Sequence, residues 1–243
     1  MLQVNVTQKI NIDIIDIYKK WQKEIKNSYP NLLSEDYSNV FCTGILENWI
    51  TSDMRILIVG EEATWKSRKD YEYNDENELQ QCQQWILNDL NQQLYDNTVK
   101  NHSSPFWQRI QIIHAAFPKA AICWTNIDVI NNAKTHRALS ENDRQKLHSC
   151  KTRVLREVVE LTKPTHILFF GWHNTSLKHE FPELISEVYP NKYGDTGYMK
   201  ENGYILKTNY NDIHIVFTYH PQSRQASSKE YTNRVIEITN ERI

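Results

Sequence analysis

Four short and strongly apolar runs recur along the chain, and their alternation with helical stretches is the feature that most constrains the fold. They read RILIVG (55–60), AAICWTNI (120–127), THILFFG (165–171) and IHIVFTY (213–219). Runs of this length, rich in β-branched and aromatic residues, are typical of buried strands. One more strand is predicted over 203–208, and the turn signal at 209–212 joins it to the last run.

The segments between these runs show the periodicity of amphipathic helices. We expect helices over 10–26, 77–95, 104–117, 140–162, 174–180 and 228–240. Ser140 with Asp143, and Ser227 with Glu230, resemble capping boxes that begin two of them. The residues expected to be buried are Ile10, Ile14, Ile17, Trp21 and Ile25 in the first helix, Leu79, Trp85, Ile86 and Leu90 in the second, and Leu147, Cys150, Val154 and Val158 in the fourth.

This order predicts an α/β fold, a three-layer α/β/α sandwich around a short, mostly parallel central sheet. No linker interrupts the pattern, so we expect a single domain over 1–243, with 1–35 as an N-terminal helical extension. Ligands of such sheets bind beyond the carboxyl ends of the strands. The segments 60–65, 125–131, 171–176 and 220–225 should therefore gather at one edge.

Composition excludes several other classes. The 243 residues carry 28 basic and 30 acidic side chains, a net charge of −2, which argues against a polybasic DNA-wrapping protein but permits a local basic groove. No apolar run approaches the ~20 residues of a membrane span, and the first residues do not resemble a signal peptide. The four cysteines are widely spaced, which favours reduced thiols in a cytoplasmic protein without a metal site.

The segment after the first run, GEEATW, offers two carboxylates. Gly60 is one of six glycines in the chain and would permit a sharp turn or the close approach of a ligand. Glu61 and Glu62 could activate water or stabilise a cation. Taken alone, they also suit a solvated turn before a helix, where anions are favoured.

Polar residues also follow two other runs. His220 comes directly after the last run, where it could donate a hydrogen bond to a developing negative charge. Asn126 could read the edge of a pyrimidine with its amide group. Phe106 could offer a ring for base stacking. Each residue alone also suits a structural role, as a loop histidine, a turn asparagine and a core aromatic.

Taken together, these pieces resemble the uracil-DNA glycosylase superfamily. Its members have a strand that runs into a motif of the GQDPY, GEAPG or GMNPG type, a strand ending in Asn, a strand ending in Gly, and a last strand ending in HPS. The equivalents here are ILIVGEEAT, ICWTN, ILFFG and IVFTYHPQS, in the same order from about residue 40 to the end. Two departures are evident: Ala63 stands where the first motif has proline, and HPQS replaces HPS.

The resemblance implies a DNA glycosylase that hydrolyses the N-glycosidic bond of uracil or another deaminated base, flips the base out of single- or double-stranded DNA, and needs no cofactor or metal. We expect a monomer. The implied catalytic residues are Glu61, Glu62 and His220. The implied base-binding residues are Gly60, Asn126 and Phe106, and the DNA-binding residues are Pro221, Ser223 and Arg224.

Two alternatives remain open at this point. The departures from the motifs are compatible with a non-catalytic or repurposed member of the fold that binds nucleic acid or a nucleotide. The same residues also suit an unrelated α/β hydrolase of small molecules that uses Glu62 and His220.

Overall fold

The computed structural model describes residues 5–62, 77–96, 104–133, 139–171, 174–183, 206–222 and 229–241. Five strands form one sheet in the order β2-β1-β3-β5-β4. Four of them are parallel, and β4 pairs antiparallel with β5. Their bounds are β1 Arg55–Glu62, β2 Ala121–Asp128, β3 His166–Phe170, β4 Leu206–Tyr210 and β5 Ile213–Thr218. The predicted mostly parallel α/β sheet is confirmed.

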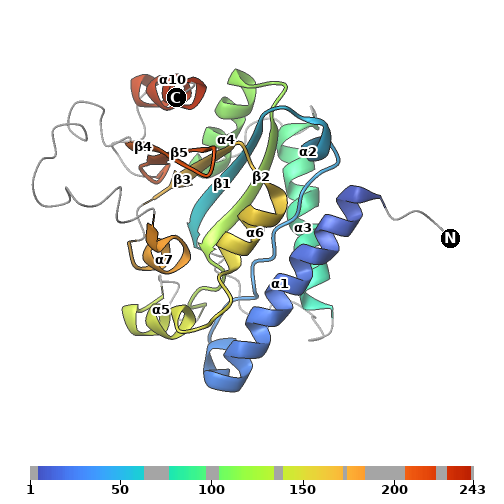
Figure 1. The fold of residues 1–243 in the computed structure, drawn as a ribbon, viewed down its shortest axis with the longest axis vertical. Coiled ribbons are helices and arrows are strands. Elements are labelled where there is room, and N and C mark those ends of the chain that lie inside the picture. Colours follow the sequence, from blue (N-terminus) through green and yellow to red (C-terminus); the bar gives the residue numbers. More distant parts are fainter. Residues whose placement is uncertain are drawn as a thin grey trace, which may run out of the picture.

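Helices cover both faces of this sheet (Figure 1). Alternate residues of β1 enter two hydrophobic clusters, because successive side chains of a strand point to opposite faces. Ile56 and Ile58 pack with α1, α3, α4 and α10, whereas Leu57 and Val59 pack with α2, α7 and one side of α6. The helix bounds are α1 Val6–Ser28, α2 Asn48–Thr51, α3 Glu78–Leu94, α4 Pro105–Ala116, α5 Glu141–His148, α6 Val154–Thr162, α7 Asn174–Glu180 and α10 Lys229–Asn240, with a 3₁₀ turn η1 at Pro30–Leu33.

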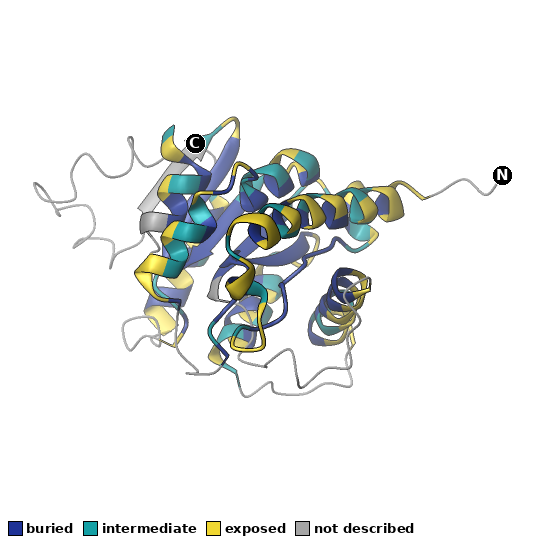
Figure 2. Cartoon of the chain, turned by 90° about the horizontal axis from the view of Figure 1, so that it is seen from below, coloured by how far each residue is buried: buried dark blue, intermediate teal, exposed yellow. Residues whose placement is uncertain are grey.

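The result is the expected three-layer sandwich. Figure 2 shows the buried strands between helices whose outer faces are exposed. The first helix belongs to this packing, because α1 buries Ile14, Tyr18, Trp21 and Ile25 in the first cluster. No helix of the described ranges is both long and apolar enough to cross a membrane.

The single helix expected over 140–162 is wrong, since the structure has two helices there, α5 and α6. Ser140 is confirmed as the N-cap of α5, with the Asp143 N–H donating to Ser140 Oγ, and Ser140 Oγ in turn donates to Asp143 Oδ2. The break after α5 has a tertiary cause. Glu24 of α1 accepts hydrogen bonds from the backbone of Lys151 and from both the backbone and the hydroxyl of Thr152. A distant carboxylate thus satisfies donors that a continuous helix would have satisfied itself.

Trp85 was expected in the core and is 42% exposed. The buried stripe of α3 includes Cys82 and Gln83. Gln83 is buried despite its polarity because its amide donates to the carbonyl oxygens of Asn11 and Thr43. A polar side chain with two good acceptors therefore occupies the inner face, and the tryptophan on the adjacent face lies outside.

The strand that was expected to stop at Gly60 continues to Glu62. Gly60 does not have a positive φ, whereas Gly171, which follows β3, has φ 129°. Gly171 therefore ends β3 because of its positive φ. Gly60 lies inside β1 for a different reason, the lack of space beside it. The turn between β4 and β5 is confirmed, with Asn211 and Asp212 at φ 48° and 64°.

The strand order also identifies the switch point of the sheet, where ligands bind in folds of this kind. The chain passes from β1 to β2 on one side and then crosses back to β3 on the other side of β1. In open α/β sheets, ligands bind at such a switch point, outside the carboxyl ends of the strands. Here the switch lies between β1 and β3; Gly60 lies two residues before the end of β1, and Gly171 directly follows β3.

Candidate functional site

Asn126 and Gly60 face each other near the carboxyl end of the sheet. They are register partners in the parallel pairing of β1 and β2. A Cβ on Gly60 would come closer than 3.0 Å to Asn126 Oδ1, a separation that real Cβ atoms essentially never show. Gly60 is therefore needed for space, because the Asn126 side chain fills the volume beside it.

Asn126 is buried, with 3% of the residue exposed. Only one of the two polar atoms of its amide has a hydrogen-bond partner among the described residues. Its Oδ1 accepts a hydrogen bond from Trp124 Nε1 at 3.3 Å. Its Nδ2 is buried and has no hydrogen-bond partner in the part of the chain that the structure describes. An unpaired buried amide N–H is costly, by about 1–3 kcal/mol. Such an atom is a natural place for a ligand oxygen to bind.

Phe106 also lies beside Gly60. It is half-buried in the first turn of α4, and its Cε2 atom would be 3.4 Å from a Cβ on Gly60. Its ring centroid is 5.1 Å from that of Trp124 and 5.8 Å from that of Phe170 at the end of β3. The ring therefore lies close to residues of β2, β1 and β3, near the switch point.

His220 follows β5 by two residues and is half-buried, next to the buried Pro221. The backbone N–H of Gln222 donates to His220 Nδ1 at 3.3 Å. An imidazole that accepts at Nδ1 is neutral and carries its proton on Nε2. His220 is thereby set up as a hydrogen-bond donor through Nε2.

The backbone that leads into His220 is held from α10. Tyr231 accepts a hydrogen bond at its hydroxyl from the Tyr219 N–H at 2.8 Å. The guanidinium of Arg109, one turn after Phe106 on α4, lies 5.6 Å from the Tyr231 ring centroid. Burial raises the pKa of Tyr231 to about 12, so its hydroxyl stays protonated. Tyr231 thus links the His220 loop to the helix that carries Phe106.

The structure describes the remaining predicted residues only in part. Glu61 and Glu62 are the last two residues of β1, and Glu62 is the register partner of Asp128. The prediction that they lie in a turn after the strand is therefore wrong, since their backbone belongs to the ladder. Ser223 and Arg224 lie outside the described residues, as do the segments 63–76 and 223–228.

Three residues that contribute to this place were missed as functional candidates: Trp124, Tyr231 and Arg109. Trp124 had a signal, because it lies two residues before Asn126 and so on the same face of a strand. Tyr231 and Arg109 had none, because their relation to His220 arises from the packing of α10 and α4.

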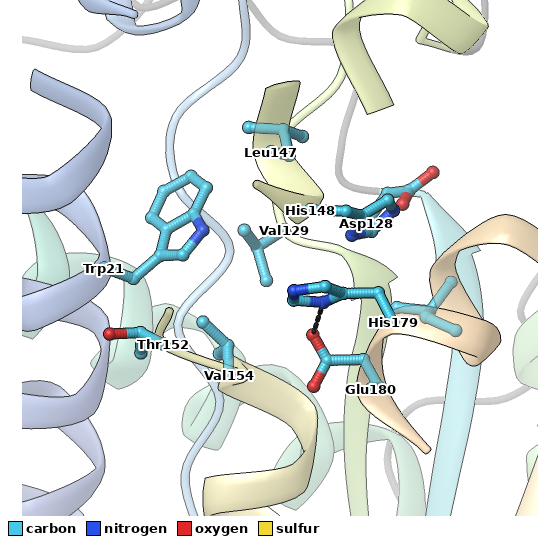
Figure 3. A pocket seen from close by; sticks show the side chains of 10 residues that line it. Trp21, Asp128, Val129, Leu147, His148, Thr152, Val154, His179 and Glu180 are labelled. Carbon is cyan, nitrogen blue, oxygen red and sulfur yellow. Dashed lines mark hydrogen bonds and ion pairs between the residues drawn. The ribbon is translucent and has the colours of Figure 1, made fainter. Parts of the chain in front are cut away.

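A separate cavity of about 20 Å³ lies beside Asp128, where β2 ends (Figure 3). The imidazoles of His148 and His179 have ring centroids 4.8 Å apart, with their planes tilted by 34°. Burial, and then the neighbouring His179, lowers the pKa of His148 to about 4. Ser176 donates to Asp128 Oδ1 at 2.8 Å, so the 3.0 Å contact between Ser176 Oγ and His148 Nε2 requires the imidazole to be the donor.

The directions of these two hydrogen bonds argue against a catalytic serine at this cavity. A serine nucleophile must give its proton to a histidine, whereas Ser176 gives its proton to the carboxylate. The volume is about that of one water molecule. Among the described residues, no three His, Cys, Asp or Glu side chains are grouped so that they could hold a metal ion. The network therefore joins α5 and α7 to β2 as a structural element.

Comparison with known proteins adds no assignment. No protein-family model matches this chain, and no curated protein matches it.

Proposed function

We propose that this chain is a DNA glycosylase-type hydrolase that cleaves the N-glycosidic bond of uracil or another deaminated base in DNA, in a reducing, cytoplasmic compartment. The observation that carries the proposal is the buried Asn126 amide beside Gly60, with one N–H₂ group unpaired among the described residues. Phe106 lies against the same glycine. The four cysteines, all buried free thiols, suit the compartment.

In the proposed mechanism, three side chains act on the base. The flipped base stacks on Phe106, and a carbonyl oxygen at its edge accepts from Asn126 Nδ2. The C1′–N bond breaks with its electron pair moving to the base, which leaves as an anion. His220 Nε2–H donates to a carbonyl oxygen of that anion, where the negative charge collects.

Water completes the reaction at the sugar. Its oxygen adds to the cationic C1′ carbon, and one of its protons passes to a carboxylate of Glu61 or Glu62 and from there to solvent. The base anion takes a proton from solvent. The products are the free base and an abasic site, and the atoms balance with water as the other reactant.

The test is incubation with single- and double-stranded oligonucleotides that contain one uracil, followed by alkali, which cleaves abasic sites. We expect strand cleavage, and we expect Asn126→Ala and His220→Ala each to lower its rate by about 10²-fold. Tyr29→Phe, which removes a hydroxyl that accepts from Ser149 and not from a residue of this site, serves as the control and should retain the rate. Intact strands at an excess of the unmodified protein would overturn the proposal.

One observation favours a second candidate, a nucleic-acid or nucleotide-binding protein without turnover. The backbone of β1 stays in the ladder through Glu62 instead of turning away after Gly60. A water-positioning carboxylate in a turn would then be missing. Under this alternative, oligonucleotides bind in a salt-sensitive manner and no base is released.

A further inference from the structure

We propose that Trp124 is a positioning residue that holds the Asn126 amide in one orientation, so that the site accepts bases with a carbonyl oxygen at the recognised edge and rejects bases with an amino group there. This inference rests on the proposed function and extends it to the choice between base classes.

The first step is the hydrogen bond itself. Trp124 and Asn126 lie two residues apart in β2, on the face that carries the first hydrophobic cluster. The indole Nε1–H donates to Asn126 Oδ1 at 3.3 Å. The indole N–H can only donate, so the atom that it meets must be the amide oxygen. The N–H₂ group of Asn126 is therefore turned away from Trp124.

The second step is that the indole cannot readily turn. Trp124 is 8% exposed. Its ring lies between three other aromatic rings, with centroid separations of 4.7 Å to Phe41, 5.1 Å to Phe106 and 5.2 Å to Trp107. A side chain packed on several sides keeps one rotamer. The direction of the N–H bond is thus set by packing and does not depend on a ligand.

The third step is the cost of the opposite amide orientation. A rotated Asn126 would bring N–H₂ against the indole N–H, two donors facing each other. The observed orientation is therefore the one that the site holds before a ligand arrives.

The selectivity follows from hydrogen-bond chemistry. A fixed N–H₂ group pairs with a carbonyl oxygen, as in the deaminated bases uracil, hypoxanthine and xanthine. An exocyclic amino group, as in cytosine or adenine, meets it donor to donor and leaves both unpaired. Sites that present a fixed polar group discriminate strongly against a partner that cannot pair with it. Because Phe106 packs on Trp124, stacking and edge recognition share one support.

The experiment compares the excision rates of uracil and cytosine from otherwise identical oligonucleotides. Trp124→Phe keeps an aromatic ring but removes the N–H. It should lower the uracil-to-cytosine ratio of kcat/KM by about 10-fold or more, since the amide can then rotate. Trp49→Phe is the control, because it also removes a buried indole N–H, one that donates to the Thr162 carbonyl oxygen in the second hydrophobic cluster, and it should leave the ratio unchanged. The ratio is independent of the folded fraction, because both substrates are assayed with the same sample.

Three results would decide against the inference. An unchanged ratio in Trp124→Phe, or an equal fall in both variants, overturns the role of Trp124 while the glycosylase proposal stands. Absence of base release and of base binding by the unmodified protein overturns both proposals.

A second measurement serves if Trp124→Phe does not fold. In the unmodified, ¹⁵N-labelled protein, titration with free uracil should shift the Asn126 side-chain N–H₂ signals, and titration with cytosine should not. Equal shifts with the two bases contradict the inference.

Discussion

The Oδ1 atom of Asn126 occupies the space that a Cβ on Gly60 would need, and the two residues are register partners on β2 and β1. Gly60 and Asn126 therefore behave as one unit. The glycine permits the buried amide, and the amide explains why this strand position holds one of only six glycines in the chain.

The Gly60→Ala variant should show this dependence. The added methyl group must displace the Asn126 amide or separate β1 from β2, and overpacking of this kind costs about 1–3 kcal/mol. We expect a lower free energy of unfolding in urea and at least ~10-fold slower base excision. Gly44→Ala is a suitable control, because its Cβ would also be crowded, 2.9 Å from Gln83 Cγ, but away from Asn126. It should lose stability and keep the excision rate of its folded fraction. Wild-type stability and rate in Gly60→Ala would contradict the account.

Tyr231→Phe tests the support of His220. The change keeps the ring that faces Arg109 and removes the hydroxyl that accepts the Tyr219 N–H. The loss should be about 1 kcal/mol of unfolding free energy. Excision should slow by about tenfold because the backbone before His220 is released. Denaturation and single-turnover rates measure the two effects. Tyr29→Phe removes an equivalent hydroxyl, which accepts from Ser149, and should not change the rate. Equal rates in the two variants would exclude a positioning role for Tyr231.

The lowered pKa of Glu24 predicts that the protein loses stability in acid. Burial raises the pKa of this carboxyl group, but hydrogen bonds from Thr152 and Lys151 outweigh it, and the pKa lies below its usual value. The charged form therefore stabilises the fold above the unfolded pKa, and this contribution is lost as the pH falls through the folded value.

Glu24→Gln should accordingly be less stable than the unmodified protein at pH 7, and the difference should shrink in acid. Unfolding curves at several pH values measure it. Glu237→Gln changes an exposed carboxylate paired with Arg234 and should have little effect. A difference that does not depend on pH would show that the charge of Glu24 is irrelevant.

The lowered pKa of His148 predicts a second pH effect on stability, below about pH 6.5. Its pKa is lowered to about 4 by burial first and by His179 next, while Asp128 and Glu141 oppose the shift and Arg144 adds to it. Between about pH 6.5 and 4 the unfolded chain then binds more protons than the folded chain. The free energy of unfolding should fall as the pH is lowered through that window.

His148→Gln retains a donor toward Ser176 and removes the titration, so stability should depend less steeply on pH. Some slope should remain, because burial and His214 lower the pKa of His166 to about 4 as well. Thermal unfolding between pH 7.5 and 5 provides the measurement. An unchanged slope would mean that His148 does not titrate as described.

Local pattern predicted the sheet well, because a buried strand must be almost wholly apolar. The runs around Ile58, Cys123 and Phe169 became β1, β2 and β3. The helix over 140–162 was predicted wrongly because its break depends on Glu24, a residue more than a hundred positions away. Trp85 was misplaced for a similar reason, since tertiary acceptors for Gln83 decided which face of α3 lies inside.

The candidate site was predicted in part. Strand ends indicated Asn126 and His220, and a parallel sheet brings such ends to one edge. The reason for Gly60 was not accessible, because it depends on the side chain of the facing strand and not on a turn. The orientation of the Asn126 amide was not accessible either, because it requires the indole of Trp124 to be held by three rings from two other segments, Phe41 and the start of α4.

The most direct test of the central claim is chromatographic detection of free base after a single turnover, with the protein in excess over a uracil-containing oligonucleotide. We expect one equivalent of free uracil and one abasic site per strand, with release about 10²-fold slower in Asn126→Ala. Bound oligonucleotide with no free base would contradict the claim that this site is catalytic.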